Sequence, residues 1–185
     1  MSPAGLLVFL INRSAWEDAL TGGDGELEAG GEQSPEAGPH PFPLALNRLE
    51  TAVLDACAGA DEWPAQVAAA IYAGVDFAIE NPAAAGELTM EAAARAGDIS
   101  QYERVIGRLA GFIRVNAPIE SRLPVSTDEA VVAGIVGLVG DHVRAGRVKR
   151  LSQLRPELVL LALLPYLGFE DAQSWANRMP QSRKR

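Results

Sequence analysis

The sequence predicts an all-α protein, and three observations lead to this fold class. From Leu44 onward, apolar residues recur three and four positions apart, which is the spacing of one face of an α-helix. The alternation of apolar and polar residues that marks a half-buried strand is rare in the same stretch. Proline, glycine and short polar residues separate the apolar periods, as they do at helix ends. Together these patterns predict a helical bundle over residues 44–179.

Two segments of different composition precede this bundle. Residues 1–20 form a short apolar segment. Residues 21–43 contain six Gly, four Pro and five acidic residues but neither Lys nor Arg. This second segment has too little apolar surface to offset its ordering entropy, so we expect a flexible linker. At the other end, residues 180–185 form a basic tail, which we expect to be solvated.

The chain is acidic, with 24 acidic and 16 basic side chains and a formal net charge of −8. Five of these negative charges lie in the 21–43 linker, which leaves −3 for the rest of the chain. Such a balance gives no general attraction to the phosphates of nucleic acids, and basic residues cluster only in the last few positions. We therefore expect no direct contact with DNA from this chain.

Composition also argues against a disulfide, a metal centre and a membrane span. The chain has one cysteine, Cys57, and two histidines, too few for an internal disulfide or a set of zinc ligands at recognisable spacing. Its three strongly apolar runs, 4–11, 130–140 and 158–164, are all much shorter than the roughly 20 residues that cross a bilayer. The composition predicts a reduced, metal-free cytoplasmic protein without a cofactor.

Helix ends can be placed from capping and breaking residues. Asp61 is a plausible N-cap, Pro82 ends one helix and can open the next, and Gly97 marks a C-terminal end. Asp98 followed by Gln101 has the spacing of a capping box. The expected helices are 44–58, 62–81, 82–95, one starting after Asp98, 126–145, one opening at Pro156, and 169–179, with a loop over 116–125.

The last two long helices are apolar on every side, and such helices need cover all round. Three glycines inside 130–140 each cost about 1 kcal/mol of helix propensity, which close approach by another helix would offset. The pattern predicts a homodimer with a four-helix interface, to which each subunit contributes two helices. Burial of both helices at the centre of a monomer is the alternative. The expected interface residues are Val131, Gly134, Ile135, Gly137, Leu138, His142, Leu158, Leu161, Ala162 and Pro165.

The order of helices from Leu44 and two sequence runs resemble a known family. The runs are AGIVGLVGDHVRAGR at 133–147 and RPELVLLALLPYLG at 155–168. They are similar to the C-terminal ligand-binding and dimerisation domain of TetR/AcrR-type bacterial transcriptional regulators. The resemblance implies an all-helical domain, a homodimer built by its last two long helices, and a pocket for a small, often hydrophobic effector.

The sequence departs from this family at its N-terminus, where the family has a three-helix DNA-binding unit. That unit needs basic residues to contact phosphates, and Arg13 is the one Lys or Arg among the 43 residues before Leu44. We expect a TetR-like effector domain that does not bind DNA by itself, and that could also pair with a full-length TetR-type regulator. The alternative is a DNA-binding TetR repressor whose helix-turn-helix is missing or misannotated at the gene start.

An enzyme that uses the helical pocket is the third and least supported hypothesis. The sequence has no catalytic motif and no paired nucleophile and base. Cys57 is expected to be a small buried residue rather than a nucleophile. Ligand pockets are lined by apolar and aromatic side chains, although each such residue here is also explained as core. The candidate ligand contacts are Tyr72, Phe77, Met90, Tyr102, Ile106 and Phe112.

Overall fold

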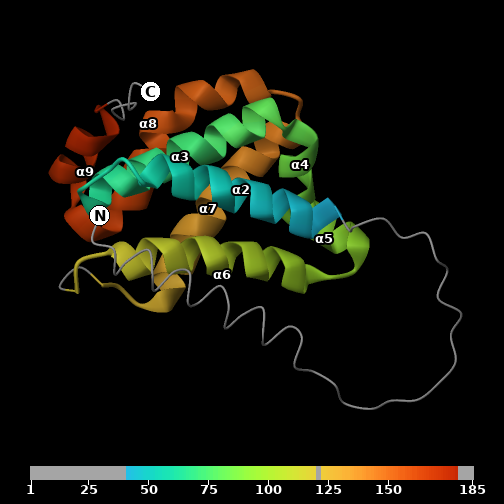
Figure 1. The fold of residues 1–185 in the computed structure, drawn as a ribbon, viewed down its shortest axis with the longest axis horizontal. Helices are drawn as coiled ribbons and strands as arrows, with labels where there is room; N and C mark the ends of the chain where they lie inside the picture. Colours follow the sequence, from blue (N-terminus) through green and yellow to red (C-terminus); the bar gives the residue numbers. More distant parts are fainter. Residues whose placement is uncertain (1–40, 120–121, 179–185) are drawn as a thin grey trace, which may run out of the picture.

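The computed structural model describes residues 41–119 and 122–178, which form α-helices and one short 3₁₀ helix (Figure 1). These two ranges contain no strand, so the predicted all-α class is confirmed for them. The α-helices are Pro41–Cys57 (α2), Trp63–Glu80 (α3), Pro82–Glu87 (α4), Met90–Ala96 (α5), Ile99–Asn116 (α6), Val125–Arg144 (α7), Leu151–Leu167 (α8) and Phe169–Ala176 (α9), and the 3₁₀ helix is Val148–Arg150 (η2).

The helical domain begins earlier than the composition suggests. The predicted 1–20 segment, the basic tail and the linker up to residue 40 lie outside the described residues. Residues 41–43, expected in the linker, form the first turn of α2, where proline is tolerated because its missing N–H would have no partner. Phe42 is buried in the core, and the Arg104 guanidinium lies 5.9 Å from its ring centroid. This apolar anchor explains why the helix extends past the predicted boundary.

Helix α3 lies at the centre of the bundle. It packs against α2 along its length and also contacts α4, α7, α8 and α9, while α6 packs on α7 and α9 on α8. In Figure 1, α2 and α3 run side by side, with α6 on one side of them and α8 on the other. The most completely buried large apolar side chains come from α3, α6 and α8. They are Val67, Val75, Val105, Leu151, Leu158, Val159 and Leu163.

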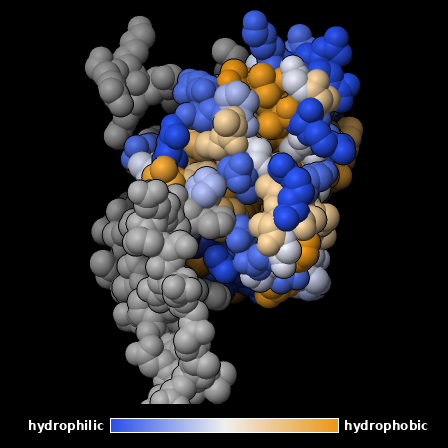
Figure 2. Space-filling view, turned by 90° about the vertical axis from the view of Figure 1, so that its right-hand side faces the viewer, coloured by the Kyte–Doolittle hydropathy of each residue, from blue (hydrophilic) through white to orange (hydrophobic). Residues whose placement is uncertain are grey.

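The prediction of one helix over 82–95 is wrong. The chain forms two short helices there, α4 and α5, with a break at Leu88 and Thr89. Leu88 is buried, which turns the chain inward at this point. The Thr89 hydroxyl donates to the Gly86 carbonyl at 2.8 Å and accepts from the Ala92 amide at 3.2 Å. One side chain therefore ends α4 and caps α5. Figure 2 views the bundle from the side on which Figure 1 labels α4 and α5, and this face carries both hydrophilic residues and groups of apolar ones.

Some of the other predicted helix ends agree with the structure and some do not. Gly97 adopts φ +71° after α5, as predicted, and Asp98 caps α6 by accepting a hydrogen bond from the Ser100 amide at 3.1 Å. The capping box predicted with Gln101 is wrong, because the Asp98 amide donates to the Ala93 carbonyl and Gln101 Nε2 donates to Asp98 Oδ2 at 3.0 Å. The helix predicted over 126–145 is α7, which begins one residue earlier, at Val125, without a side-chain cap. Glu62, not Asp61, precedes α3. Helix α8 begins at Leu151 rather than at Pro156.

One buried carboxylate connects three helices. Asp128 of α7 is 1% exposed, and its Oδ2 lies 2.6 Å from Nη1 of Arg114 on α6. Its Oδ1 accepts a hydrogen bond from the Tyr166 hydroxyl of α8. Trp63 of α3 packs edge-on against the Tyr166 ring, with 5.1 Å between centroids. We call these four residues the Asp128 cluster, and they join α3, α6, α7 and α8 at one end of the bundle.

Asp128→Asn is expected to lower the free energy of unfolding by about 3 kcal/mol, because Arg114 and Tyr166 lose a buried charged acceptor. The matched control is Glu129→Gln, which removes the same charge from an exposed neighbour and should change stability by no more than about 0.5 kcal/mol. Urea unfolding followed by circular dichroism measures both. Equal effects of the two substitutions would contradict a structural role for the cluster.

Candidate functional site

A cavity of about 130 Å³ lies inside the helical bundle. Helix α3 contributes the largest share of its wall, and α2, α4, α6, α7 and α8 complete it together with the turn between α4 and α5. Among the described residues that line it, only Thr89 has a polar side chain, and that hydroxyl is already used in capping α5. The cavity therefore offers apolar contact and no charged partner.

The cavity follows from small residues on one face of α3. Ala70, Gly74 and Ala78 are spaced four positions apart, so they lie on one face, and all three line the cavity. Val132 and Val136 face it from α7, and their short side chains leave the space unfilled. The small residues of α3 and the short valines of α7 do not fill the space between them, whereas larger side chains would. The cavity is this unfilled space.

Gly140 brings α7 close to the α4–α5 turn beside the cavity. A Cβ built on Gly140 would lie 3.2 Å from Thr89 Cγ2, closer than ordinary van der Waals contact. The packing of α7 against the α4–α5 turn within one chain therefore requires glycine at position 140. Gly134 and Gly137, the other two glycines of the apolar run 130–140, are exposed.

Two of the six predicted ligand residues, Phe77 and Phe112, line the cavity. The other four do not line it. Tyr72 packs beneath Arg155, whose guanidinium lies 4.9 Å from its ring centroid, and Met90 is 51% exposed at the start of α5.

Tyr102 and Ile106 are buried in the core and do not line the cavity, whereas Val105 and Leu109 of the same helix do. Ile106 is turned away from its neighbour Val105 by about 100°, the rotation of one step along a helix. Tyr102 lies on the same side of α6 as Leu109 but two turns nearer the start of the helix.

Helix α7 lines the cavity with residues that are not among the predicted ligand contacts. Its cavity-facing aliphatic residues, in addition to Gly140, are Val132, Ile135, Val136 and Val139. The predicted ligand contacts lie on α3, α5 and α6, because the sequence predicts a partner subunit against α7. The sequence contains one indication of this cavity: Val132 and Val136 on α7, and Ala70 and Gly74 on α3, are each four positions apart and so place small or short side chains on one face of each helix.

The predicted interface residues divide into two sets. Gly134, Gly137, Leu138 and Pro165 are exposed, and Leu161 and His142 are partly buried. Ile135 lines the cavity. Val131, Leu158 and Ala162 are buried within the chain, so the prediction that they form an interface is wrong for these three. They lie on the faces of α7 and α8 that complete the chain's own core.

Two side chains with potential chemistry are occupied locally. His142 Nδ1 donates to the Leu138 carbonyl of its own helix at 2.9 Å. The Cys57 thiol is buried at the end of α2, as predicted, and donates to the Gln66 carbonyl at 3.3 Å. Burial raises the pKa of this thiol to about 12, so at neutral pH it is not a thiolate nucleophile.

Within residues 41–119 and 122–178, no three His, Cys, Asp or Glu side chains are grouped so that they could hold a metal ion. None of the helices in these ranges is long and apolar enough to cross a membrane.

Comparisons with models of protein families, with curated proteins and with solved structures found no match.

Native protein is expected to react with a disulfide reagent at pH 8 at least about a hundredfold more slowly than unfolded protein, because the Cys57 thiol is buried and its pKa is raised to about 12. Release of thionitrobenzoate measures the rate, and the same protein in 8 M urea serves as the control. Equally fast reaction in the two states would show that Cys57 is accessible.

Proposed function

We propose that this chain is the effector-binding and dimerisation module of a TetR-like regulatory protein, and that it binds a small nonpolar ligand in the cavity. The apolar cavity inside the helical bundle is the observation that carries the proposal. Burial of apolar ligand surface is favourable by roughly 25 cal/mol per Å², and no charged group in the wall has to be desolvated. The wall selects against ligands that bring a charge into the cavity.

The volume limits the size of the ligand. An engineered apolar cavity of about 150 Å³ holds benzene, so the 130 Å³ cavity has room for a group of about one ring. Pockets for larger ligands occupy about 300 Å³ or more. A larger effector would have to displace part of the wall.

Two glycines on α7 favour a second copy of the chain as partner. A Cβ at Gly137 would meet nothing within 4 Å, and at Gly134 it would meet Leu161 at an ordinary 3.9 Å. Packing within one chain therefore requires neither glycine, although each costs about 1 kcal/mol of helix propensity. Close approach by a partner helix explains them. The same face, with Leu138 and Pro165 exposed, could also pair with a full-length TetR-type regulator.

Ligand binding and dimerisation share α7. Val132, Val136 and Val139 face the cavity, while Gly134 and Gly137 face outward from the same helix. A ligand that shifts the inner face of α7 would therefore also move its outer face. This shared wall provides a physical route from effector binding to regulation, since rigid helices transmit such displacements.

Val139→Phe is expected to weaken binding of toluene, a one-ring apolar probe, at least tenfold, because the phenyl ring would fill part of the cavity. Val143→Phe is the matched control one turn along α7, at a partly buried valine that does not line the cavity, and it should retain binding. Isothermal titration calorimetry measures both affinities. The proposal fails if the native chain does not bind toluene, or if the two variants bind it equally well.

Leu138→Glu is expected to convert a dimer into a monomer, because Leu138 is 44% exposed on the proposed interface and a charge there would be buried without a partner. Leu44→Glu is the matched control on α2, where leucine is 55% exposed and away from that face. Sedimentation equilibrium should give twice the 19.6 kDa chain mass for the native protein and the control. A monomeric native chain would contradict the proposed dimer.

A further inference from the structure

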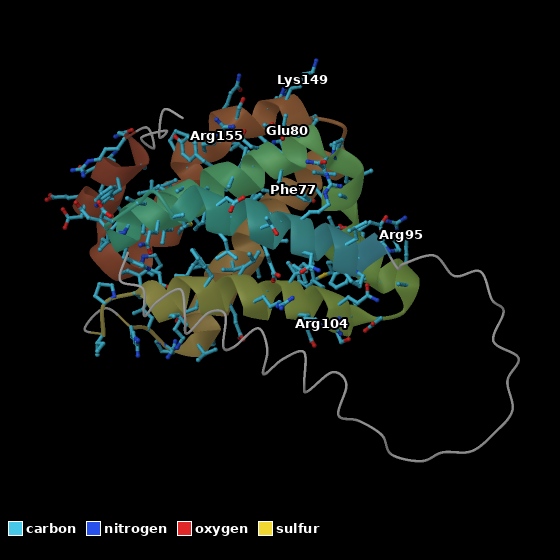
Figure 3. All side chains as sticks on the ribbon, viewed as in Figure 1. Phe77, Glu80, Arg95, Arg104, Lys149 and Arg155 are labelled. Carbon is cyan, nitrogen blue, oxygen red and sulfur yellow. The ribbon has the colours of Figure 1, made fainter. Side chains whose placement is uncertain are left out.

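Basic side chains are concentrated in the connection between α7 and α8. Residues 142–156 contain five Lys or Arg and no Asp or Glu, in a chain whose formal net charge is −8. The expectation that basic residues cluster only at the end of the chain is therefore wrong. Arg147, Lys149 and Arg150 are exposed, and none of them forms an ion pair with a carboxylate of the described residues. We call these three residues the basic turn. Figure 3 shows the Lys149 side chain directed away from the bundle.

The backbone holds the basic turn in a defined shape. Gly146 adopts φ +64°, and the Arg147 amide donates to the His142 carbonyl at 2.8 Å, which closes α7 in a Schellman motif. Between the cations, Val148 packs against the core, and Leu151, which follows them, is completely buried. These two apolar anchors fix the turn to the bundle, so its cations are presented together on the outside.

The surroundings of the basic turn favour an anionic partner. Helix α8 starts directly after it and has no acidic residue in its first turn. The N-terminus of a helix carries a partial positive charge, so the position of Lys149 and Arg150 there is electrostatically unfavourable. Arg144, at the end of α7, has carboxylate neighbours in Asp141 and Glu91. The cations that a further anion would stabilise are therefore those next to the start of α8.

A segment of this chain has the opposite charge. Residues 21–40 contain five carboxylates and no Lys or Arg. The segment joins the described bundle at Pro41, where α2 begins. The chain therefore carries an acidic segment without cations and a basic turn without acids, and the two are complementary in charge.

The start of α2 and the basic turn both lie at the end of the bundle where α3 ends. Arg48, two turns into α2, donates a hydrogen bond to Asn81, the residue that follows α3. Helix α8 runs antiparallel to α3, and Arg155 in its second turn forms an ion pair with Asp76, one turn before the end of α3. The 3₁₀ helix η2, which carries Lys149 and Arg150, also contacts α3.

The acidic segment is long enough to reach the basic turn. Helix α2 packs on α3 and α3 packs on α8, so about 20 Å separates α2 from α8, at about 8–10 Å for each packed pair. A flexible segment of the length of residues 21–40 spans about 25 Å on average. Its carboxylates can therefore meet the cations without any change in the bundle.

We propose that the acidic segment 21–40 docks on the basic turn of its own chain. Its carboxylates would lie beside Arg147, Lys149 and Arg150. Ion pairs at an exposed site are weak, but the tether through α2 keeps the segment at a high effective concentration near the turn. Docked there, the segment would cover the cations and keep other polyanions away from them. This inference depends neither on ligand binding in the cavity nor on dimerisation.

Paramagnetic relaxation in the full chain tests this contact. Gly30→Cys places a thiol in the middle of the acidic segment for a nitroxide label, and the buried Cys57 should stay unlabelled. At about 20 mM salt, the amide signals of Lys149 and Arg150 should lose at least about half of their intensity relative to the reduced label, and at about 500 mM salt most of it should return, because salt screens ion pairs.

A matched pair of double variants tests the charges. Lys149→Gln combined with Arg150→Gln removes two cations of the basic turn and should restore most of the intensity lost at the Arg147 amide. Arg122→Gln combined with Arg178→Gln removes the same charge from exposed residues elsewhere and should leave the broadening of the basic turn unchanged.

Each outcome decides for or against the docking. Broadening that is lost both in high salt and in the basic-turn double variant supports it. Basic-turn signals that are not broadened at low salt, or that respond equally to the two double variants, overturn it. A mixture of labelled chain with isotope-enriched unlabelled chain detects contact between copies. Broadening as strong in this mixture as in the labelled chain itself would overturn docking within one chain.

Discussion

The arrangement of the helices depends on one buried carboxylate. Asp128 is almost completely removed from water, so its charge is tolerated only because Arg114 and Tyr166 supply donors on two other helices. Arg114 also donates to the Leu123 carbonyl at 2.8 Å, which ties the chain segment before α7 to the end of α6. Helices α6, α7 and α8 all contribute to the cavity wall, so the cluster fixes the mutual position of the elements that form it.

The cavity is a local departure from the dense packing of the rest of the core. Unfilled apolar volume reduces stability, since the atoms around it lack contact partners. The chain retains this void in the middle of its longest helices, between Gly74 of α3 and Val136 of α7, rather than at an edge. An apolar group bound there, as proposed, would regain the missing contacts and would therefore raise the free energy of unfolding.

The sequence was sufficient to predict the helical class and the burial of Cys57, because periodicity and composition are local signals. It was insufficient at Thr89, where an alanine-rich run is compatible with one continuous helix and the break depends on the burial of Leu88. It also could not separate Tyr102, in the core, from Val105, in the cavity wall. Both residues belong to the apolar side of α6, and which of them meets the void depends on the rotation of α6 against α3 and α7.

The alternation of roles along α7 has an evolutionary consequence. Inward positions such as Val132 and Val136 are interleaved with outward positions such as Gly134 and Gly137, so mutations can reach one set without altering the other. Gene duplicates could diverge in the compound they recognise while keeping their ability to pair, or could change pairing while keeping the compound. A single helix of this kind lets two traits be selected separately, although both are encoded within a few adjacent codons.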